Sequence, residues 1–205
     1  NYDVTITPGA DIAIRYIFEL FTDRNNKKIL SIDPTYGMVD VYADIFRYKV
    51  KKIDEKNLNE FSNKKNYNDI QFVYLANPNN PSGENIKTDT LNKILNICIE
   101  KKILLILDEV YVDYSSQKSF LKEIKNKINN ILILRSFSKS IGLAGLRVGY
   151  VIGSKKNIRI FNSIRPPHDT SYLSIKIANF LYDGEKKYLQ QIKKSKKFVV
   201  EDRKS

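Results

Sequence analysis

Ile131-Leu132-Ile133-Leu134-Arg135-Ser136-Phe137-Ser138-Lys139 is the stretch that decides the fold of this chain. Its apolar start predicts a buried strand, and this run is followed by two serines and a lysine. A lysine just past the end of a buried strand can lie in a pocket, where lysines act as nucleophiles toward carbonyl groups. Arg147 follows eight residues after Lys139, and hydroxyls with an arginine are suitable ligands for a phosphate. A solvated lysine at a strand end is the alternative, so the rest of the chain has to decide.

Short apolar runs of this kind alternate with helix-like segments along the chain. Strands are expected at 4–7, 28–32, 48–53, 71–75, 103–107 and 131–134, with a last one ending at Ile152. One helix is expected to begin at 9–11, and a second one to end at Phe46. Further helices are expected from Thr88 or Asp89 to about Lys102, and over 120–127, 155–164, 174–182 and 185–205. The alternation predicts an α/β fold of three layers, with a mostly parallel central sheet and helices on both faces.

Four of the expected strands end in unusual polar clusters. They are Asp33-Pro34-Thr35-Tyr36, Asn80-Pro81-Ser82-Gly83, Asp108-Glu109-Val110-Tyr111 and Ser136-Phe137-Ser138-Lys139. Ligands of parallel sheets bind beyond the carboxyl ends of the strands, so we expect these clusters to share one edge. Gly9-Ala10-Asp11 adds the start of a helix, where free N–H groups and the positive dipole suit a phosphate.

Together the clusters offer what a pyridine aldehyde phosphate needs. Lys139 would serve its aldehyde, and Asp108 would keep its ring nitrogen protonated. Asn80 and Tyr111 would serve its phenolic oxygen, and Tyr36 would stack on its ring. The expected phosphate ligands are Gly9, Ala10, Ser136, Ser138 and Arg147, and Asp11 at the helix start is a further expected cofactor-binding residue. Each of these residues taken alone has an ordinary structural role in a turn, a cap or a core, and the prediction rests on their occurrence together.

The motifs resemble those of aminotransferases of the pyridoxal-phosphate fold-type I superfamily, classes I and II. Within that group the chain is most similar to the histidinol-phosphate aminotransferase branch. The resemblance spans nearly the whole chain and implies the fold of the large domain of these enzymes. The motifs that carry it are Pro34-Thr35-Tyr36-Gly37-Met38, Asn77-Pro78-Asn79-Asn80-Pro81-Ser82-Gly83, Asp108-Glu109-Val110-Tyr111, Ser136-Phe137-Ser138-Lys139 and Gly142-Leu143-Ala144-Gly145-Leu146-Arg147.

The resemblance also implies the chemistry. Lys139 would form a Schiff base with pyridoxal 5'-phosphate and move the proton at the substrate Cα, with Asp108 and Tyr111 as the other catalytic residues. An amino group would pass between an amino acid or amino-phosphate donor and a 2-oxo acid acceptor. Arg165 and His168 fall in a region that reaches a neighbouring active site in related enzymes, where they would read an acidic group of the substrate. A surface turn is the open alternative for these two.

Domain organisation is also implied by the resemblance. Residues 1–182 would be the cofactor-binding large domain, and residues 183–205 would begin the helix that connects to a C-terminal small domain absent from the chain. Family members carry an N-terminal arm and a small domain whose arginine grips the substrate carboxylate. We therefore expect this chain to bind the cofactor but to turn over poorly or not at all. A cytoplasmic homodimer is expected.

Composition bounds the other functions. The net charge of +12 invites a nucleic-acid partner, but the lysines are spread along surface-type positions, so none is expected. No apolar run approaches the ~20 residues of a membrane span. Cys98 is the one cysteine, which excludes an intrachain disulfide, and His168 is the one histidine, which excludes a histidine-rich metal site.

Three alternatives stay open at this stage. A decarboxylase or lyase of the same fold, similar to threonine-phosphate decarboxylase, would use the same cofactor pocket. A nucleoside triphosphatase is favoured by Leu104-Leu105-Ile106-Leu107-Asp108-Glu109, but its phosphate-binding Gly-x-x-x-x-Gly-Lys-Ser/Thr loop is missing. A nucleic-acid-binding module would show salt-sensitive binding and no visible cofactor absorbance.

Overall fold

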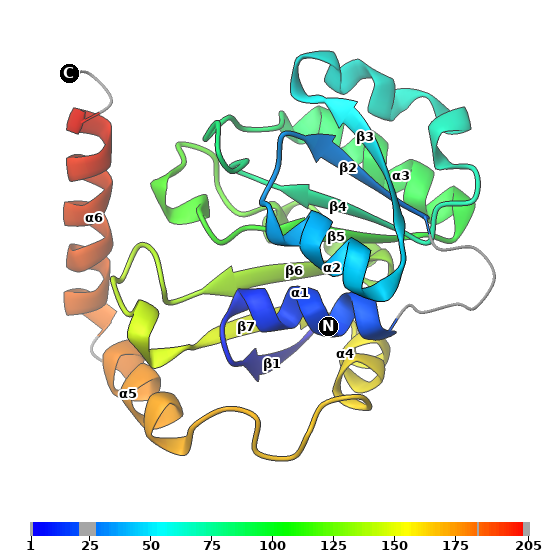
Figure 1. Cartoon of the computed structure of the whole chain (residues 1–205). Helices are drawn as coiled ribbons and strands as arrows, with labels where there is room; N and C mark the ends of the chain where they lie inside the picture. The colour runs from blue at the N-terminus through cyan, green and yellow to red at the C-terminus, as the bar shows by residue number, and fades with distance from the viewer. Residues whose placement is uncertain (1, 21–27, 184, 203–205) are drawn as a thin grey trace.

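The computed structural model describes residues 2–20, 28–183 and 185–202. Its strands are β1 (Asp3–Thr7), β2 (Lys28–Asp33), β3 (Lys49–Asp54), β4 (Phe72–Ala76), β5 (Leu104–Asp108), β6 (Ile131–Ser136) and β7 (Gly149–Gly153). The described strands form one seven-stranded sheet in the order β1-β7-β6-β5-β4-β2-β3 (Figure 1). Strands β3, β2, β4, β5 and β6 are parallel, whereas β7 is antiparallel to both β6 and β1. The mostly parallel sheet and the edge position of the third strand are confirmed.

Helices cover both faces of this sheet. They are α1 (Ala10–Leu20), α2 (Met38–Phe46), α3 (Thr88–Lys101), α4 (Lys155–Asn162), α5 (Tyr172–Asp183) and α6 (Glu185–Asp202). Short 3-10 helices are η1 (Glu55–Ser62), η2 (Lys64–Tyr67), η3 (Val112–Tyr114), η4 (Phe120–Lys122), η5 (Lys125–Asn130) and η6 (Ala144–Leu146). One hydrophobic core lies between the sheet and α1, α2 and α4, and the other lies between the sheet and α3 with the 3-10 helices beside it. The three-layer prediction is therefore confirmed.

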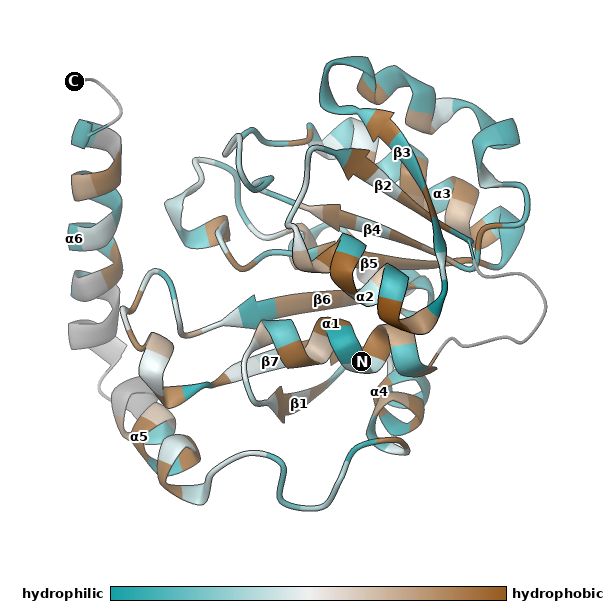
Figure 2. Cartoon of the chain, in the orientation of Figure 1, coloured by the Kyte–Doolittle hydropathy of each residue, from teal (hydrophilic) through white to brown (hydrophobic). Residues whose placement is uncertain are grey.

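Alternate side chains of the central strands belong to the two cores. In β4, Val73 and Leu75 point to the α3 side, whereas Phe72 and Tyr74 point to the α1 side. Successive side chains of a strand face opposite ways, so a strand buried on both faces is apolar throughout. Figure 2 accordingly shows the central strands largely in brown. The same parity places Asp108 and Ser136 on the α1 side, which decides the face on which the site forms.

Two local predictions were wrong. Neither Thr88 nor Asp89 caps α3, because the helix already begins at Thr88 and its N-cap is Lys87, which makes no side-chain cap hydrogen bond. The single helix expected over 120–127 is two 3-10 helices, η4 and η5. Segments this short gain little from a full α-helical turn, because nucleation costs more than a few hydrogen bonds return.

The last two helices lie at one end of the molecule. Helix α5 packs against α6, and α6 contacts η3 beside the sheet (Figure 1). The Lys196 ammonium of α6 donates to the Ser115 carbonyl. Among the described helices, none combines the length and the apolar character that crossing a membrane requires.

Candidate active site

Strand register builds a cavity at the carboxyl edge of the sheet. Ala76 of β4 lies beside Asp108 of β5, and Asp108 lies beside Leu134 of β6, two residues before Ser136. The cavity there measures about 230 Å³. Ten of the predicted site residues line it, namely Ala10, Asp11, Tyr36, Asn80, Asp108, Tyr111, Ser136, Ser138, Lys139 and Arg147. The expected convergence of the polar clusters on one edge is thus found in the structure.

Asp108 is the buried acid of this cavity. Its Oδ2 accepts a hydrogen bond from the Tyr74 hydroxyl at 2.7 Å, and its Oδ1 accepts one from the Val110 backbone N–H at 2.9 Å. Burial raises the pKa of the Asp108 carboxyl above its ordinary value, although these two donors and the positive charge of Lys139 oppose the rise. A carboxylate accepts up to about four hydrogen bonds, so this one retains capacity for a further donor.

Lys139 supplies the amine of the site. Its Nζ lies 5.1 Å from the centre of the Tyr111 ring, which is within cation–π range. Within the described part of the chain, the Lys139 ammonium makes neither a hydrogen bond nor an ion pair. The Asn80 side-chain amide likewise has no hydrogen-bond partner among the described residues. Lys139 is exposed and Asn80 is half-buried, and both line the cavity, so their polar groups are accessible to a ligand.

Two glycines shape the opposite end of the cavity. Gly9 has φ +85°, and a Cβ built on it would lie 2.7 Å from Nη2 of Arg147. A Cβ on Gly149 would lie 2.6 Å from the Ala10 backbone nitrogen. Only glycine permits these approaches, which bring the guanidinium of Arg147 to the first turn of α1. Gly9 itself does not line the cavity and acts by making room for Arg147.

The first turn of α1 and the end of β6 complete an anion site. The N–H groups of Ala10 and Asp11 belong to a helix start, where backbone donors lack intrahelical partners. The Ser136 hydroxyl accepts a hydrogen bond from the Ser138 backbone N–H at 3.0 Å, which fixes the turn before Lys139. Backbone donors, hydroxyls and one guanidinium are the groups that bind phosphate in proteins.

The Tyr36 hydroxyl is hydrogen-bonded to the Asp11 carboxylate, and both residues line the cavity. Asp11 accepts a hydrogen bond from the Tyr42 hydroxyl at 3.0 Å and a longer one from the Tyr36 hydroxyl at 3.5 Å. Burial and the negative charge of Asp11 raise the pKa of both tyrosine hydroxyls. The Asp11 side chain thus orients the Tyr36 ring, and Asp11 itself lines the cavity.

Asn79 joins the two turns that carry Tyr36 and Asn80. Its amide donates to the Pro34 carbonyl and to Glu55 Oε1, both at 2.9 Å. The same Glu55 oxygen accepts a hydrogen bond from the Ser82 hydroxyl at 2.6 Å. Asn79 is only 2% exposed, so this polar cluster is a buried tie between the turn after β2 and the turn after β4.

The sequence matches the family model described as "Aminotransferase class I and II" over residues 1–205. The chain belongs to this family. Histidinol-phosphate aminotransferase of Buchnera aphidicola subsp. Cinara cedri is 35% identical to it, with 97% of this chain and 58% of the relative covered. The enzyme of that name from Bacteroides thetaiotaomicron is 31% identical over 95% of this chain and 57% of the relative. The chain therefore spans somewhat more than half the length of these curated relatives.

Solved structures share the fold of this chain. Histidinol-phosphate aminotransferase from Clostridium acetobutylicum superposes with a TM-score of 0.81 at 24% identity, covering 99% of this chain and 60% of that one. L-threonine-O-3-phosphate decarboxylase from Porphyromonas gingivalis superposes with a TM-score of 0.74 at 23% identity, covering 87% of this chain and 52% of that one. The predicted fold-type I architecture is confirmed by these neighbours.

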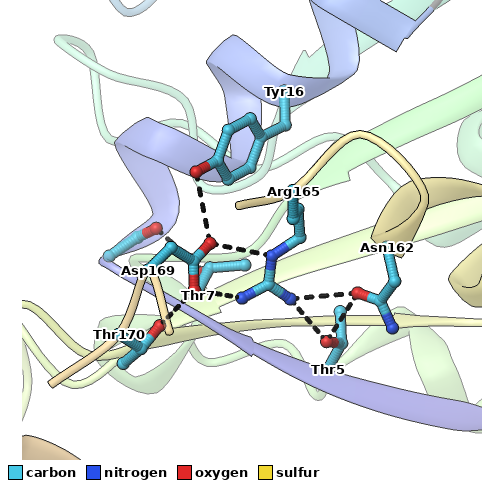
Figure 3. A network of polar contacts seen from close by, with 8 residues as sticks. Thr5, Thr7, Tyr16, Asn162, Arg165, Asp169 and Thr170 are labelled. Carbon is cyan, nitrogen blue, oxygen red and sulfur yellow. Dashed lines mark hydrogen bonds and ion pairs between the residues drawn. The ribbon is translucent and has the colours of Figure 1, made fainter. Parts of the chain in front are cut away.

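Arg165 and His168 lie away from the cavity of this aminotransferase-family chain. They line a separate hollow beside β1. Figure 3 shows the Arg165 guanidinium between Asp169, which it contacts at 2.7 and 2.9 Å, and Thr5 with Asn162, which it contacts at 2.7 and 3.0 Å. We call Arg165, Asp169, Thr5, Asn162 and Tyr16 the Arg165 cluster; the Tyr16 hydroxyl donates to Asp169. Arg165 makes four hydrogen bonds there, whereas His168 is exposed with φ +62°.

Sequence reasoning missed the residues that act behind the pocket. Tyr74, Tyr42 and Asn79 have side chains that contact predicted site residues or the turns that carry them. The sequence did contain one indication of the role of Tyr74. Its hydroxyl lies in an otherwise apolar strand, and a buried hydroxyl needs a hydrogen-bond partner. The described residues contain no group of three or more histidine, cysteine, aspartate or glutamate side chains that could hold a metal ion.

Proposed function

We propose that this chain forms the cofactor-binding part of a pyridoxal-phosphate-dependent aminotransferase. The observation that carries the proposal is the convergence of Lys139, Asp108 and Arg147 on one cavity of about 230 Å³. An amine without a protein partner, a buried acid with a spare acceptor site and a guanidinium at a helix start are separated along this cavity. Those three chemistries match the aldehyde, the ring nitrogen and the phosphate of pyridoxal phosphate.

Each end of the cavity would hold one part of the cofactor. Ala10, Ser136, Ser138 and Arg147 would bind its phosphate, and the room left by Gly9 lets Arg147 take part. Asp108 would accept from the protonated ring nitrogen. Asn80 and Tyr111 would hydrogen-bond the phenolic oxygen, and the Tyr36 ring, anchored through Asp11, would cover one face.

The residues of the chain would divide the catalytic work. Bound pyridoxal phosphate supplies an aldehyde that condenses with amines and a protonated ring that withdraws electrons from the substrate Cα. Lys139 Nζ would take a proton from one carbon and return it to another, which is general acid–base catalysis by a side chain within reach of both. Asp108 would keep negative charge at the ring nitrogen throughout. Tyr111, beside Lys139, would hold a hydrogen bond in place while the lysine moves.

Domain organisation and assembly belong to the same proposal. Residues 1–182 would be the large domain, and 183–205, of which 184 and 203–205 lie outside the described residues, would begin the helix toward a small domain. The intact protein would be a homodimer. His168 would then be the better candidate for reading a substrate in the neighbouring subunit, because Arg165 already has its partners.

Visible absorption of the protein after addition of pyridoxal phosphate tests the central assignment. The parent chain should gain a cofactor band and yield a borohydride-reducible adduct on the peptide that contains Lys139. Lys139→Ala should lose that adduct while retaining phosphate-dependent binding through Arg147. A reducible lysine adduct that persists in Lys139→Ala would overturn the assignment.

An assay of the intact protein with an amino donor and 2-oxoglutarate tests the reaction class. The relatives are named histidinol-phosphate aminotransferases, so an amino-phosphate donor is the first substrate to try. Formation of a new amino acid from the 2-oxo acid is expected. Release of carbon dioxide without a new amino acid would favour the decarboxylase alternative, since the same fold occurs in L-threonine-O-3-phosphate decarboxylase.

A further inference from the structure

The side chain of Tyr74 carries a hydroxyl within β4, a strand whose other side chains are apolar and buried. The residue is 1% exposed and belongs to the aromatic and aliphatic core between the sheet and helices α1 and α2. A phenylalanine would fill that volume without burying a hydroxyl, and a buried hydroxyl without a partner is costly. The hydroxyl of Tyr74 has a partner, Asp108 Oδ2 at 2.7 Å.

Neighbouring strands fix this contact. Tyr74 on β4 pairs in register with Ile106 on β5, and Ala76 pairs with Asp108. Side chains of the same parity point to the same face, so the Tyr74 ring runs beneath Ala76 and brings its hydroxyl to the carboxylate. Asp108 lines the cavity, whereas Tyr74 lies behind it.

We propose that Tyr74 is a positioning residue of the cofactor site, whose hydroxyl keeps the Asp108 carboxylate ionised and aimed at the ring nitrogen. The inference rests on the proposed function and deepens it. One oxygen of Asp108 is fixed by the Val110 backbone N–H and the other by Tyr74, both neutral donors. Two neutral donors stabilise the charge without neutralising it, so it remains available to a cationic ring nitrogen.

The protonation state of Asp108 also depends on the other ionisable groups around it. Lys139 favours the ionised acid, whereas Glu109 and Tyr36 interact with it across the end of the strand. Burial of the carboxyl opposes ionisation more strongly than any of these groups alone. Loss of the Tyr74 hydroxyl therefore moves Asp108 toward the neutral acid, which cannot pair with a protonated ring.

Tyr74→Phe and Tyr67→Phe form a matched pair of variants. Tyr67 is also buried, and its hydroxyl donates to the Phe61 carbonyl at 2.7 Å in the other core. In the protein without added cofactor, the infrared carbonyl band of protonated Asp108 is identified by its loss in Asp108→Asn and followed against pH. The protonation midpoint should rise in Tyr74→Phe and stay at the parent value in Tyr67→Phe.

A second variant covers the case in which Tyr74→Phe fails to fold. Site-specific 3-fluorotyrosine at position 74 keeps the shape of the residue and makes its hydroxyl a stronger donor. The Asp108 midpoint should then move down, opposite to its movement in Tyr74→Phe. Midpoints that match the parent in both variants would overturn the inference.

Binding of pyridoxal phosphate gives the second readout. Tyr74→Phe should bind it about tenfold more weakly than Tyr67→Phe, since a hydrogen bond to a charged group is lost. Nitrogen-15 NMR of ring-labelled cofactor should show deprotonation at lower pH. Equal affinity and equal ring protonation in the two variants overturn the inference while the function stands. A parent chain that binds no cofactor overturns the proposed function, and the positioning role falls with it, even where the midpoints shift.

Discussion

Asp108, which is buried in the cavity, and Asp169, which is half-buried in the Arg165 cluster, are two aspartates whose partners differ. Asp169 in the Arg165 cluster accepts from Nη2 and Nε of the guanidinium at 2.7 and 2.9 Å, and Nη1 of that guanidinium donates to Thr5 and Asn162. Asp108 in the cavity receives only a tyrosine hydroxyl and a backbone N–H, with Lys139 as a nearby charge. The Asp169 carboxylate is therefore paired with a cation of the protein, whereas the Asp108 carboxylate retains capacity to accept a hydrogen bond from a ligand.

The pKa values of the two acids express that difference. Burial alone would raise the pKa of Asp169, but the hydrogen bonds and charge of Arg165 outweigh it and leave the pKa lowered. For Asp108, burial wins and the pKa is raised. A charge paired within the protein stabilises the fold, whereas a buried charge held for a ligand costs stability until the ligand arrives. Substitutions in the two regions should consequently affect different measurements.

Arg165→Met should have the largest effect on stability. Both side chains of the Arg165–Asp169 pair are nearly buried, at 12% and 10% exposure. Removing the guanidinium leaves the Asp169 carboxylate with only the neutral donors Tyr16 and Thr170, which costs about 2 kcal/mol in the free energy of unfolding. Urea unfolding of the cofactor-free protein measures this loss.

Lys52→Met is the matched control for that substitution. Lys52 pairs with Asp33 at 3.2 Å and Asp40 at 2.8 Å, but its side chain is 39% exposed. An exposed pair contributes about 0.5 kcal/mol, so this variant should unfold close to the parent. Similar losses in Arg165→Met and Lys52→Met would remove the distinction between the Arg165 cluster and an ordinary surface ion pair.

Arg147→Met should reverse the pattern of Arg165→Met. Within the described residues, the Arg147 guanidinium makes a single hydrogen bond, a long one of 3.4 Å to the Ala144 carbonyl, so its loss should change the free energy of unfolding by less than about 0.5 kcal/mol. Affinity for pyridoxal phosphate should fall about thirtyfold, because charge-assisted bonds to the phosphate are lost. Titration of the cofactor band measures this. A variant that unfolds easily but binds normally would place Arg147 with the structural residues.

A pH series distinguishes the two aspartates by sign. The lowered pKa of Asp169 means that its stabilisation is present above the ordinary carboxyl value of 3.8 and is lost as pH falls through the lowered value. The raised pKa of Asp108 means that its favourable contribution is present below 3.8 and is lost as pH rises through the raised value. At neutral pH, Asp169→Asn should be less stable than the parent, and Asp108→Asn should be more stable.

Urea unfolding between about pH 3 and pH 7 measures both differences in the absence of cofactor. The difference for Asp108→Asn should close at the acid end, where that carboxyl is neutral, and the difference for Asp169→Asn should shrink as pH falls toward its lowered pKa. The difference for Asp108→Asn should be smaller than the loss in Arg165→Met. Destabilisation of Asp108→Asn at neutral pH would show that its charge is satisfied by the protein and would break the comparison.

Sequence reasoning was most successful where chemistry follows from position along a strand. Lys139, Asp108 and Asn80 each follow an apolar run, and the parallel sheet brings such ends together without further information. It failed where a role depends on which side chain another side chain meets. Asp11 was expected to bind the cofactor, but the hydrogen bonds that its carboxylate accepts from Tyr36 and Tyr42 depend on how α2 and the turn before it pack on α1.

The same limit applies to the Arg165 cluster. Arg165 and Asp169 are one helical turn apart in sequence, but Thr5 is 160 residues away from Arg165 and belongs to the edge strand. No local pattern shows that the guanidinium is already fully used by the fold. Long-range pairing of this kind depends on the antiparallel placement of β1 beside β7, which the alternation of strands and helices does not specify.

Tyr42→Phe should give the smallest effect and the finest test of the comparison. The Tyr42 hydroxyl donates to Asp11 at 3.0 Å, and Asp11 in turn accepts from Tyr36 at 3.5 Å, so the variant loosens the ring that covers the cavity. Cofactor affinity should fall about threefold, since the substituted group acts through two others. Titration of the cofactor band measures it, and circular dichroism of that band should weaken as the ring loses its fixed orientation.

Tyr48→Phe serves as the control, because Tyr48 lies in the same core and its hydroxyl donates to the Phe18 carbonyl at 3.1 Å, away from the cavity. It should lower the free energy of unfolding by about 1 kcal/mol and leave cofactor affinity at the parent value. If the two variants lose the same affinity, the effect of Tyr42 is a general loosening of the core. If only Tyr42→Phe loses affinity, the hydrogen bond from Tyr42 to Asp11 supports cofactor binding through Tyr36. The residues that determine cofactor affinity then include one behind Asp11.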